Sequence, residues 1–186
     1  MKSVSGLLAN LDHSMIKGTE EGVITALVYD SRKVTEGCMF VCIKGAVYDS
    51  HEHVEEIAAK GARVIVAERE VEVPEGVTLV RVADSRRALA LLSAAYFDHP
   101  AEKLRVIGIT GTKGKTMTTY MVKGILEHAG YKVGLIGTIE TIIGETHIPA
   151  NNTTPESYVI QDSFAQMVEA GCQICVMEVS SQGLMM

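Results

Sequence analysis

The sequence predicts an α/β protein: a small N-terminal α/β domain followed by the start of a second, mostly parallel α/β domain. Strand-like and helix-like patterns alternate along the chain. The strands of the second part are almost entirely apolar, which is typical of parallel strands covered on both faces. Between the two parts, Asp98-His99-Pro100 interrupts the pattern, because Pro100 disfavours helix at His99. We therefore expect one domain at residues 1–99 and another at residues 100–186.

The first domain is expected to begin with a short helix, because Leu7, Leu8 and Leu11 have helical spacing. Short apolar runs predict four strands, at Ile24–Val28, Met39–Ile43, Arg63–Ala67 and Thr78–Val82. Two further helices are predicted, at His51–Lys60 with Gly61 as its C-terminal cap, and from a cap at Asp84 or Ser85 to Phe97.

The second domain repeats the strand–helix alternation with longer helices. Three strands and one hairpin are predicted, at Leu104–Thr110, Val133–Ile136, Ile174–Val179 and, around Gly144, Thr141–Ile148. A helix is predicted at Lys115–Ala129, with an apolar face made of Met117, Met121, Ile125 and Leu126. A second helix should run to Ala170, with Thr154 as its N-cap, Pro155 at its first position and Gly171 after its end.

Composition restricts the class of protein. The 186 residues are 47% hydrophobic and 22% charged, which is ordinary for a globular chain. The net charge of −6 gives no overall attraction for nucleic acid or for anionic lipid. No apolar run reaches the length of about 18 residues that a membrane span needs, and the N-terminus is too weakly apolar for a secretory signal. We expect a cytoplasmic monomer without membrane insertion.

The four cysteines are Cys38, Cys42, Cys172 and Cys175. The spacing of Cys172 and Cys175 also occurs in zinc and redox sites. A structural zinc site needs about four ligands, and no second pair fits. We therefore interpret all four as buried free thiols in a reducing compartment.

The segment Thr110–Thr116, which reads Thr-Gly-Thr-Lys-Gly-Lys-Thr, lies where a predicted strand ends and a helix begins. In such loops glycines let backbone N–H groups converge on phosphate oxygens, and the helix N-terminus adds partial positive charge. A lysine reaches the terminal phosphates and the next hydroxyl coordinates Mg²⁺; Lys115 and Thr116 are these residue types. The second domain is therefore predicted to be a P-loop ATPase domain.

The strict P-loop pattern is incomplete. Its first glycine would fall at Ile109, and Gly108 lies one residue too early. A glycine-rich turn with an incidental Gly-Lys-Thr is the alternative, but the order of strand, loop and helix favours phosphate binding. Lys113 is a second cation of the loop, and it either contacts phosphate or is solvated.

The segment Gly108–Thr116 resembles the ATP loop of the Mur ligase family. Three further stretches resemble one branch of that family, the UDP-N-acetylmuramoyl-tripeptide synthetases. These are Asp30-Ser31-Arg32-Lys33-Val34 with Gly37 and Phe40-Val41, then Asn152–Ser157, and then Met177–Ser181. The stretches occur in the order of the family and extend from about Ser31 to Ser181.

The resemblance implies a role for each matching residue. Ser31 would contact the UDP part of the substrate, and Asn152, Thr153, Thr154 and Ser180 its UDP-muramoyl portion. ATP would be held by the loop residues Gly111, Thr112, Lys113, Gly114, Lys115 and Thr116. Mg²⁺ would be coordinated by Thr116 and Glu178, so that Lys115 and Glu178 are the expected catalytic residues.

Simpler structural roles remain open for several of these residues. Ser31 could form a turn, and Thr154 could be only a helix cap, although capping and ligand contact are compatible. Glu178 follows an apolar strand, where a carboxylate is costly unless it is paired or bound to metal. His51 and His53 are interpreted as loop or surface residues without a role.

The implied reaction is ATP-dependent amide-bond formation in peptidoglycan precursor synthesis. The carboxylate of UDP-N-acetylmuramoyl-L-Ala-D-Glu would attack the γ-phosphate of ATP and give an acyl phosphate. The amino group of a third amino acid would then displace phosphate. Positioning and charge neutralisation dominate such phosphoryl transfer. The sequence leaves open whether lysine, diaminopimelate or another amino acid is added.

Two departures from the family pattern qualify these expectations. Gln182 follows the paired serines where the family usually has histidine, which leaves a second Mg²⁺ open. The chain ends at Met186, before the arginine, the metal-bridging lysine and the C-terminal ligase domain of full-length relatives. We expect an N-terminal fragment that binds UDP-sugar or ATP weakly and does not ligate.

Three other functions remain possible from the sequence. A folate polyglutamate or cyanophycin synthetase belongs to the same superfamily, but the segment around Asp30-Ser31-Arg32 argues against it. A non-catalytic nucleotide-binding or regulatory module could keep the fold without the ligase half. A simple P-loop NTPase or kinase would bind ATP without a UDP-linked substrate.

Overall fold

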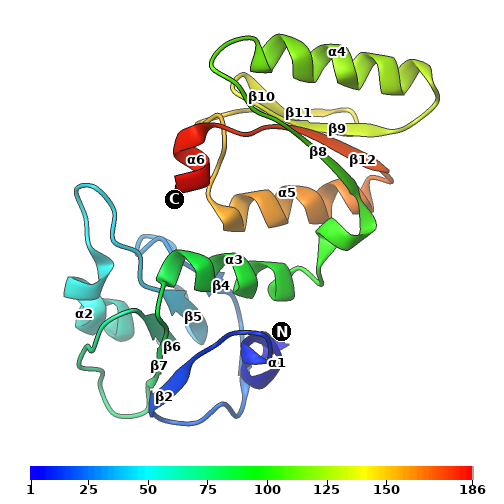
Figure 1. Cartoon of the computed structure of the whole chain (residues 1–186). Helices are drawn as coiled ribbons and strands as arrows, with labels where there is room; N and C mark the ends of the chain where they lie inside the picture. Colours follow the sequence, from blue (N-terminus) through cyan, green and yellow to red (C-terminus); the bar gives the residue numbers. More distant parts are fainter. Residues whose placement is uncertain (186) are drawn as a thin grey trace. The chain divides into compact units, whose positions relative to one another are not determined.

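A computed structural model describes residues 1–185 of the chain. The chain forms two compact units, Met1–Tyr96 (unit 1) and Phe97–Met186 (unit 2), and each is an α/β structure (Figure 1). Near the start of unit 2, Asp98 and His99 have positive φ angles of 59° and 51°. Within the described residues, no helix is long and apolar enough to cross a membrane.

Unit 1 is built on a five-stranded sheet with the order β2-β7-β6-β5-β4. The strands β4, β5, β6 and β7 run parallel, and β2 pairs antiparallel with β7. Their bounds are β2 Ser14–Lys17, β4 Leu27–Val28, β5 Cys38–Val41, β6 Ala62–Ala67 and β7 Thr78–Arg81. The parallel strands therefore end at one edge, and the loops that follow them meet there.

Helices bury both faces of this sheet. The helices are α1 Val4–Leu8, α2 Val54–Ala59 and α3 Ser85–Tyr96, and the 3₁₀ helix η1 Ser50–His53 precedes α2. Ile57 of α2 packs with Phe40 and Ile65 in one apolar cluster. Because residues alternate between the two faces along a strand, the other face of the sheet also carries apolar side chains. Helix α3 contacts β4 and β5. Asp84 caps α3 as predicted, because its Oδ1 accepts hydrogen bonds from the backbone N–H groups of Arg86 and Arg87.

The predicted strand Ile24–Val28 is wrong as a single element. Ile24 belongs to β3 (Val23–Ile24), which pairs with β1 (Lys2–Ser3) in a separate two-stranded sheet. Leu27 belongs to β4 and pairs with Met39 of β5. The strand pairing changes between Ile24 and Leu27, so the two ends of this apolar run belong to different sheets. Strand β2 was not predicted, because three of its four residues are exposed and give it no apolar pattern.

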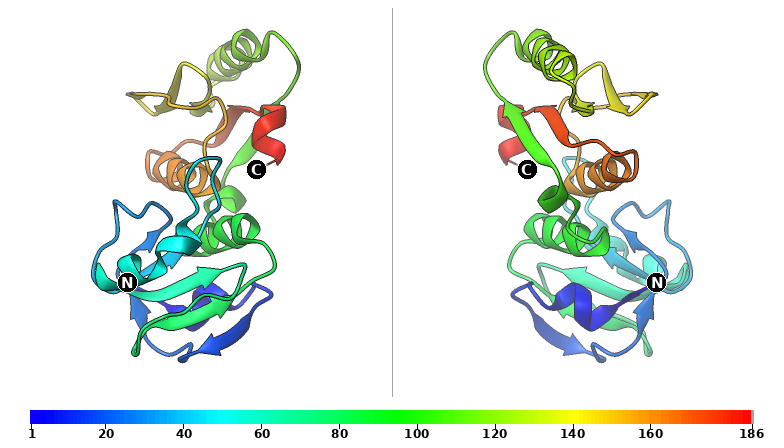
Figure 2. Two further views of the ribbon diagram at one scale, coloured as in Figure 1. Left: turned by 90° about the vertical axis from the view of Figure 1, so that its left-hand side faces the viewer. Right: turned by 90° about the vertical axis from the view of Figure 1, so that its right-hand side faces the viewer.

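Unit 2 contains a five-stranded sheet with the order β11-β10-β9-β12-β8. The bounds are β8 Arg105–Ile109, β9 Val133–Ile136, β10 Glu140–Ile143, β11 Thr146–Pro149 and β12 Ile174–Glu178. The strands β8, β12 and β9 run parallel, and β10 and β11 form the predicted hairpin around Gly144. This hairpin extends outward at one edge of the sheet (Figure 2).

Helices α4 (Lys115–His128) and α5 (Ser157–Glu169) cover opposite faces of the sheet of unit 2 (Figure 1). Phe164 and Met167 of α5 pack with Ile136 and Cys175. On the other face, Leu126 of α4 packs against Val133, Ile174 and Val176. The short elements η2 (Pro100–Lys103) and α6 (Ser181–Met185) precede β8 and follow β12.

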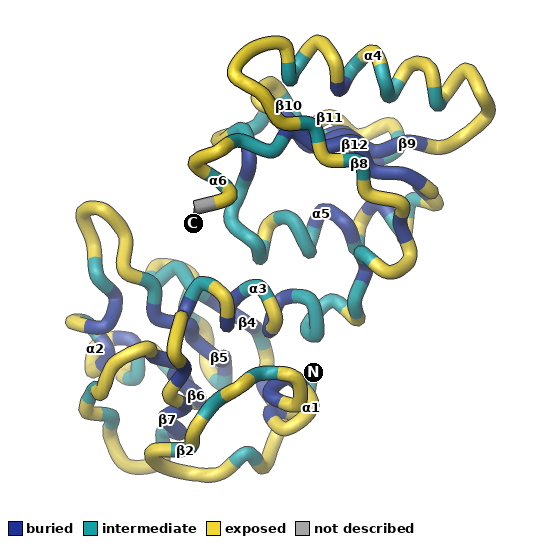
Figure 3. Tube along the Cα trace, in the orientation of Figure 1, coloured by how far each residue is buried: buried dark blue, intermediate teal, exposed yellow. Residues whose placement is uncertain are grey.

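The predicted apolar face of α4 is wrong for three of its four residues. Met117, Met121 and Ile125 are 70%, 60% and 66% exposed, and exposed and half-buried residues alternate along the helix (Figure 3). The helix instead buries Thr119, whose hydroxyl donates to the carbonyl of Thr116 at 2.8 Å. That local hydrogen bond removes the cost of burying a hydroxyl. The prediction failed because it assumed that only apolar side chains of the helix would face the sheet.

All four cysteines are buried and free, as expected from their apolar surroundings. Burial raises the pKa of Cys42 and of Cys175 to about 12. Since the thiolate is the reactive form, both thiols stay protonated and unreactive at neutral pH.

Replacing Phe40 by alanine is expected to lower the free energy of unfolding by about 3–5 kcal/mol. Phe40 is fully buried, so its loss leaves a cavity between α2 and the sheet. Guanidinium unfolding followed by far-UV circular dichroism measures this. Ile16→Ala on β2, where the side chain is exposed, is the control and should cost about 0.5 kcal/mol. Equal losses in both variants would contradict this core.

Candidate functional site

The glycine-rich loop of unit 2 joins the end of β8 to the start of α4, as predicted. Gly114 is the N-cap of α4 and adopts a left-handed conformation with φ of 81°, which glycine tolerates without strain. Nζ of Lys115 donates to the carbonyl of Gly111 at 2.9 Å, so the ammonium lies against the loop. The loop thus combines a helix N-terminus with a cation, as anion binding requires.

The carboxylate of Glu178 lies beside this loop at the end of β12. The parallel register pairs Glu178 with Ile109, the last residue of β8. Glu178 is only 1% exposed, and a buried carboxylate is costly without partners. Its Oε2 accepts a hydrogen bond from the hydroxyl of Thr116 at 3.0 Å. The two residues predicted to hold a metal are therefore in direct contact.

Thr138 completes the surroundings of Glu178 and was not predicted. Its backbone N–H donates to Oε1 of Glu178 at 2.8 Å, and its hydroxyl lies 3.1 Å from Oε2. The preceding Gly137 permits this approach, because a Cβ there would lie 2.6 Å from Oε1. Thr138 follows β9, the parallel neighbour of β12, and side chains after such strands meet at the same edge. That rule was the signal that could have identified it.

The predicted substrate residues adjoin the same carboxylate. The hydroxyl oxygens of Thr153 and Thr138 lie 3.0 Å apart, and because the one proton of Thr138 is donated to Glu178, the Thr153 hydroxyl is the donor of this pair. The hydroxyl of Thr154 donates to the carbonyl of Glu178 at 3.0 Å and accepts from the N–H of Ser180 at 2.9 Å. Both segments are therefore linked to the end of β12 through side-chain hydrogen bonds.

The prediction that Thr154 caps α5 is wrong. The helix begins at Ser157, and its N-cap Glu156 makes no side-chain cap hydrogen bond. The hydroxyl of Thr154 is engaged by Glu178 and Ser180 instead, because tertiary hydrogen bonds are available to it at the end of β12. Pro155 consequently precedes the helix and does not occupy its first position.

The oxygen atoms around Glu178 fit a hard divalent cation. Mg²⁺ is usually bound through one or two protein oxygens together with substrate phosphates. The hydroxyl of Thr116 and the carboxylate of Glu178 are such oxygens, and they adjoin the phosphate-type loop. Among residues 1–185, no group of three or more His, Cys, Asp or Glu could hold a metal by itself.

Ser31 lies in unit 1, in the loop that follows β4. The preceding Asp30 is paired with Arg32, whose Nε and Nη2 donate to the two carboxylate oxygens at 2.9 and 2.8 Å. These hydrogen bonds and the charge of Arg32 lower the pKa of Asp30 to about 2. The hydroxyl of Tyr48 donates to Oγ of Ser31 at 3.4 Å, and Nζ of Lys60 donates to its carbonyl at 3.4 Å.

The remaining predicted site residues lie at the surface. Lys113, Asn152 and Gln182 are exposed. In unit 1, His51 was interpreted as a loop or surface residue, and this is wrong: its side chain is 1% exposed and hydrogen-bonded. His53 is partly exposed, and its ring stacks on that of Tyr48.

Two family models match the chain. The first, described as "Mur ligase family, catalytic domain", matches residues 23–97, and the second, "Mur ligase middle domain", matches residues 109–186. A relative from Clostridium perfringens (strain 13 / Type A) is named UDP-N-acetylmuramoyl-L-alanyl-D-glutamate--2,6-diaminopimelate ligase. It is 46% identical over 181 residues. This match covers 97% of the chain and 37% of the relative, so the chain spans little more than a third of the relative's length.

Solved structures share the fold. One described as "Structure of UDP-N-acetylmuramoyl-L-alanyl-D-glutamate--2, 6-diaminopimelate ligase" gives a TM-score of 0.78 at 21% identity. The match covers 100% of this chain and 37% of the chain in that structure. The ligase MurF from Thermotoga maritima in complex with ADP gives a TM-score of 0.57 at 27% identity. That match covers 84% of this chain and 32% of the other.

Replacing Thr138 by valine is expected to destabilise the protein by about 1–3 kcal/mol, because Glu178 loses a hydroxyl donor while it stays buried. Chemical unfolding followed by circular dichroism measures the change. Thr138→Ser keeps the hydroxyl and should retain most of the stability. If serine and valine cost the same, the hydroxyl does not support the carboxylate.

The pKa of Asp30 is expected to be about 2 and to rise toward its ordinary value in Arg32→Gln. A lowered pKa means that this ion pair stabilises the fold above the ordinary carboxyl pKa and stops doing so as the pH falls toward about 2. Titration of the Asp30 carboxyl carbon by NMR measures both values. Arg32→Lys should give an Asp30 pKa between the two values. If the pKa of Asp30 is the same in all Arg32 variants, the pairing is excluded.

Proposed function

Because the chain belongs to the Mur ligase family, we propose that it binds ATP and a UDP-linked muramoyl peptide for amide-bond formation. The whole reaction would add diaminopimelate to UDP-N-acetylmuramoyl-L-alanyl-D-glutamate, as the names of its relatives suggest. It would take place in the cytoplasm. One observation carries the proposal: Thr116 of the loop contacts Glu178, and Thr138 connects Glu178 to Thr153. An ATP-type site and a substrate-type segment thus share one carboxylate.

The loop supports binding of the ATP phosphates. Backbone N–H groups at the start of α4 are free of intrahelical partners, and the helix dipole favours an anion there. Lys115 donates to the neutral carbonyl of Gly111, and a phosphate oxygen would be a stronger acceptor because the bond is then charge-assisted on both sides. When ATP binds, the ammonium of Lys115 would leave the carbonyl of Gly111 and donate to a phosphate oxygen.

Thr116 and Glu178 would hold Mg²⁺ beside those phosphates. The ion would neutralise charge on the phosphates during transfer. Thr138 would keep the Glu178 carboxylate oriented, since its N–H donates to Oε1 and leaves Oε2 toward Thr116. Burial of the carboxylate reduces competition from water and strengthens its electrostatic interactions.

Thr153, Thr154 and Ser180 would position the muramoyl peptide. Thr154 is fixed by two hydrogen bonds, to the carbonyl of Glu178 and from the N–H of Ser180. It therefore holds the backbone of its own segment at the end of β12. Thr153, next to it, presents its hydroxyl beside Thr138. A substrate carboxylate bound here would be oriented toward the phosphate to be attacked, which is the main requirement for this transfer.

Isothermal titration of the 186-residue chain with ATP and Mg²⁺, and separately with UDP, tests the proposal. Both ligands should bind. Lys115→Ala should weaken ATP binding about 10- to 100-fold, because a charged hydrogen bond contributes about 1.5–3 kcal/mol. Glu178→Gln should reduce the Mg²⁺ dependence of ATP binding and leave UDP binding unchanged.

Lys103→Ala is the matched control, since Lys103 is an exposed lysine of unit 2 outside the loop. Its ATP affinity should equal that of the unaltered chain. ATP binding without UDP binding would favour a simple nucleotide hydrolase or kinase over the proposed ligase. Absence of ATP binding in the unaltered chain would overturn the assignment of the loop.

A further inference from the structure

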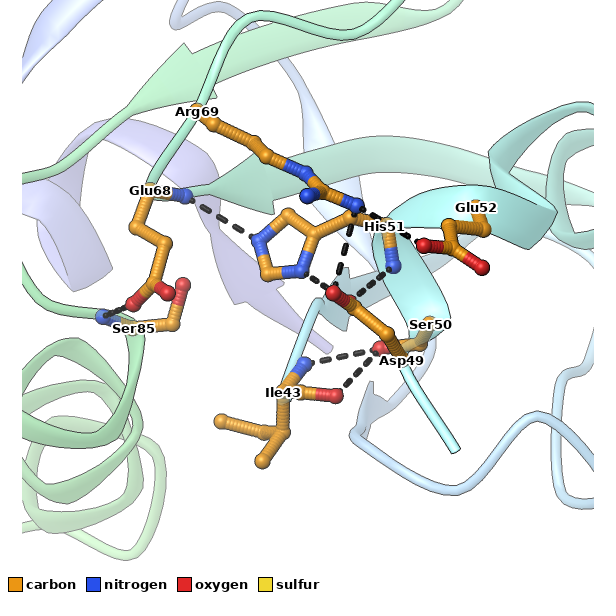
Figure 4. A network of polar contacts seen from close by, with 8 residues as sticks. All are labelled: Ile43, Asp49, Ser50, His51, Glu52, Glu68, Arg69 and Ser85. Atoms are coloured by element: carbon orange, nitrogen blue, oxygen red, sulfur yellow. Dashed lines mark hydrogen bonds and ion pairs between the residues drawn. The ribbon is translucent and has the colours of Figure 1, made fainter. Parts of the chain in front are cut away.

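A polar network around the buried side chain of His51 in unit 1 connects the ends of three structural elements (Figure 4). Nδ1 of His51 lies 2.7 Å from Oδ1 of Asp49, and Nε2 lies 3.3 Å from the backbone nitrogen of Glu68. A backbone N–H can only donate, so Nε2 is the acceptor and the ring proton is on Nδ1, facing Asp49. Glu68 in turn accepts a hydrogen bond from the N–H of Ser85, the first residue of α3.

Asp49 is the centre of this network. Its second oxygen, Oδ2, is paired with Nη2 of Arg69 at 3.2 Å, and Oδ1 also accepts from the backbone N–H of His51. Burial raises the pKa of Asp49, but the hydrogen bonds from His51 and the charge of Arg69 outweigh it, and the pKa lies below its ordinary value. Asp49 therefore stays ionised and holds both neighbours.

The exposed loop Lys44–Asp49 adjoins this network, and further hydrogen bonds close its base. The hydroxyl of Ser50 accepts from the N–H of Ile43 at 2.7 Å and donates to its carbonyl at 3.0 Å. Lys44 and Asp49 form an antiparallel bridge, so the two ends of the loop lie side by side. Inside the loop, the N–H of Gly45 donates to the carbonyl of Tyr48 at 2.8 Å.

Tyr48 connects this loop to Ser31. Its hydroxyl donates to Oγ of Ser31, and its ring stacks on His53 with a centroid distance of 4.7 Å and an interplanar angle of 7°. The Tyr48–Ser31 bond, at 3.4 Å, is at the weak end of the range. Such a contact cannot by itself order a loop whose tip, Val47, is fully exposed. The position of Tyr48 must come from the base of the loop.

We propose that Asp49, His51 and Arg69 are positioning residues that act through Tyr48. They would hold the loop so that the Tyr48 hydroxyl orients the hydroxyl of Ser31 toward the UDP part of the substrate. The inference rests on the proposed function for the role of Ser31. An ion pair with an exposed partner contributes little to stability, and Arg69 is 48% exposed, so a network of this kind after β5 and β6 is better explained by positioning.

Amide hydrogen exchange of the free chain tests the first step without any ligand. Arg69→Gln removes one arm of the network from a side chain that is 48% exposed, so the variant is expected to fold. Exchange at the N–H of Gly45 should accelerate at least about fivefold. Arg81→Gln, at an exposed arginine of the same sheet, is the control and should leave Gly45 unchanged. An unchanged Gly45 in Arg69→Gln would refute the positioning role, whether or not UDP binds.

A double-mutant cycle measured by titration with UDP tests the second step. Tyr48→Phe and Arg69→Gln should each weaken UDP binding about three- to tenfold, the effect of one hydrogen bond. If Arg69 acts through Tyr48, the double variant should bind no more weakly than the weaker single variant. If the losses in binding free energy of the two single variants add in the double variant, Arg69 acts independently of the Tyr48 hydroxyl, and the inference is overturned.

The outcomes separate the two proposals. ATP binding should be the same in all these variants, because the phosphate loop belongs to unit 2. If the unaltered chain binds ATP but not UDP, the proposed function fails and the role of Ser31 with it. If UDP binds and both single variants bind it as well as the unaltered chain, only the inference about the loop fails.

Discussion

The buried carboxylate of Glu178 is the constraint on which the site of unit 2 depends. At 1% exposure it needs donors on both oxygens. Thr116 and Thr138 supply them from the start of α4 and the end of β9. They reach the same carboxylate only because β8, β12 and β9 are parallel neighbours that end at one edge. The apolar register of the sheet thus determines the polar geometry of the site.

The same topology operates in unit 1 with different chemistry. There the loops after β4, β5 and β6 carry Ser31, Asp49 and Arg69. Asp49 is ionised and both of its oxygens are bonded, so this carboxylate holds His51 and Arg69 in one arrangement. In each unit, then, one carboxylate at the carboxyl edge organises the loops around it.

The sequence was sufficient where the relevant residues are contiguous. The turn of Gly114, Lys115 and Thr116 lies between a strand and a helix that local patterns already predict, and the structure has both. The role of Glu178 as a partnered carboxylate could be anticipated from the cost of a charge after an apolar strand. The hairpin around Gly144 likewise follows from local turn chemistry.

Sequence reasoning failed where partners come from distant segments. Thr154 has the propensity of a helix cap, but hydrogen bonds to Glu178 and from Ser180 outweigh that preference. His51 has no local signal of burial: Asp49 is a local partner two residues away, but Glu68, at the end of β6, comes from a distant segment. Thr119 is buried in place of more apolar residues because a hydrogen bond within α4 satisfies its hydroxyl. For Thr154 and His51 contacts with distant segments decided the outcome, whereas for Thr119 a hydrogen bond within its own helix did.

The two sites differ in how firmly their groups are held, and this bears on function. The contacts around Glu178 range from 2.8 to 3.1 Å and come from the ends of a helix and of strands. Those around Ser31 are 3.4 Å and come from a loop and a lysine side chain. Preorganised groups suit charge stabilisation during phosphoryl transfer, whereas loop-borne groups adapt to a ligand. This difference supports the proposal that the chemistry takes place beside Glu178 and that Ser31 serves recognition.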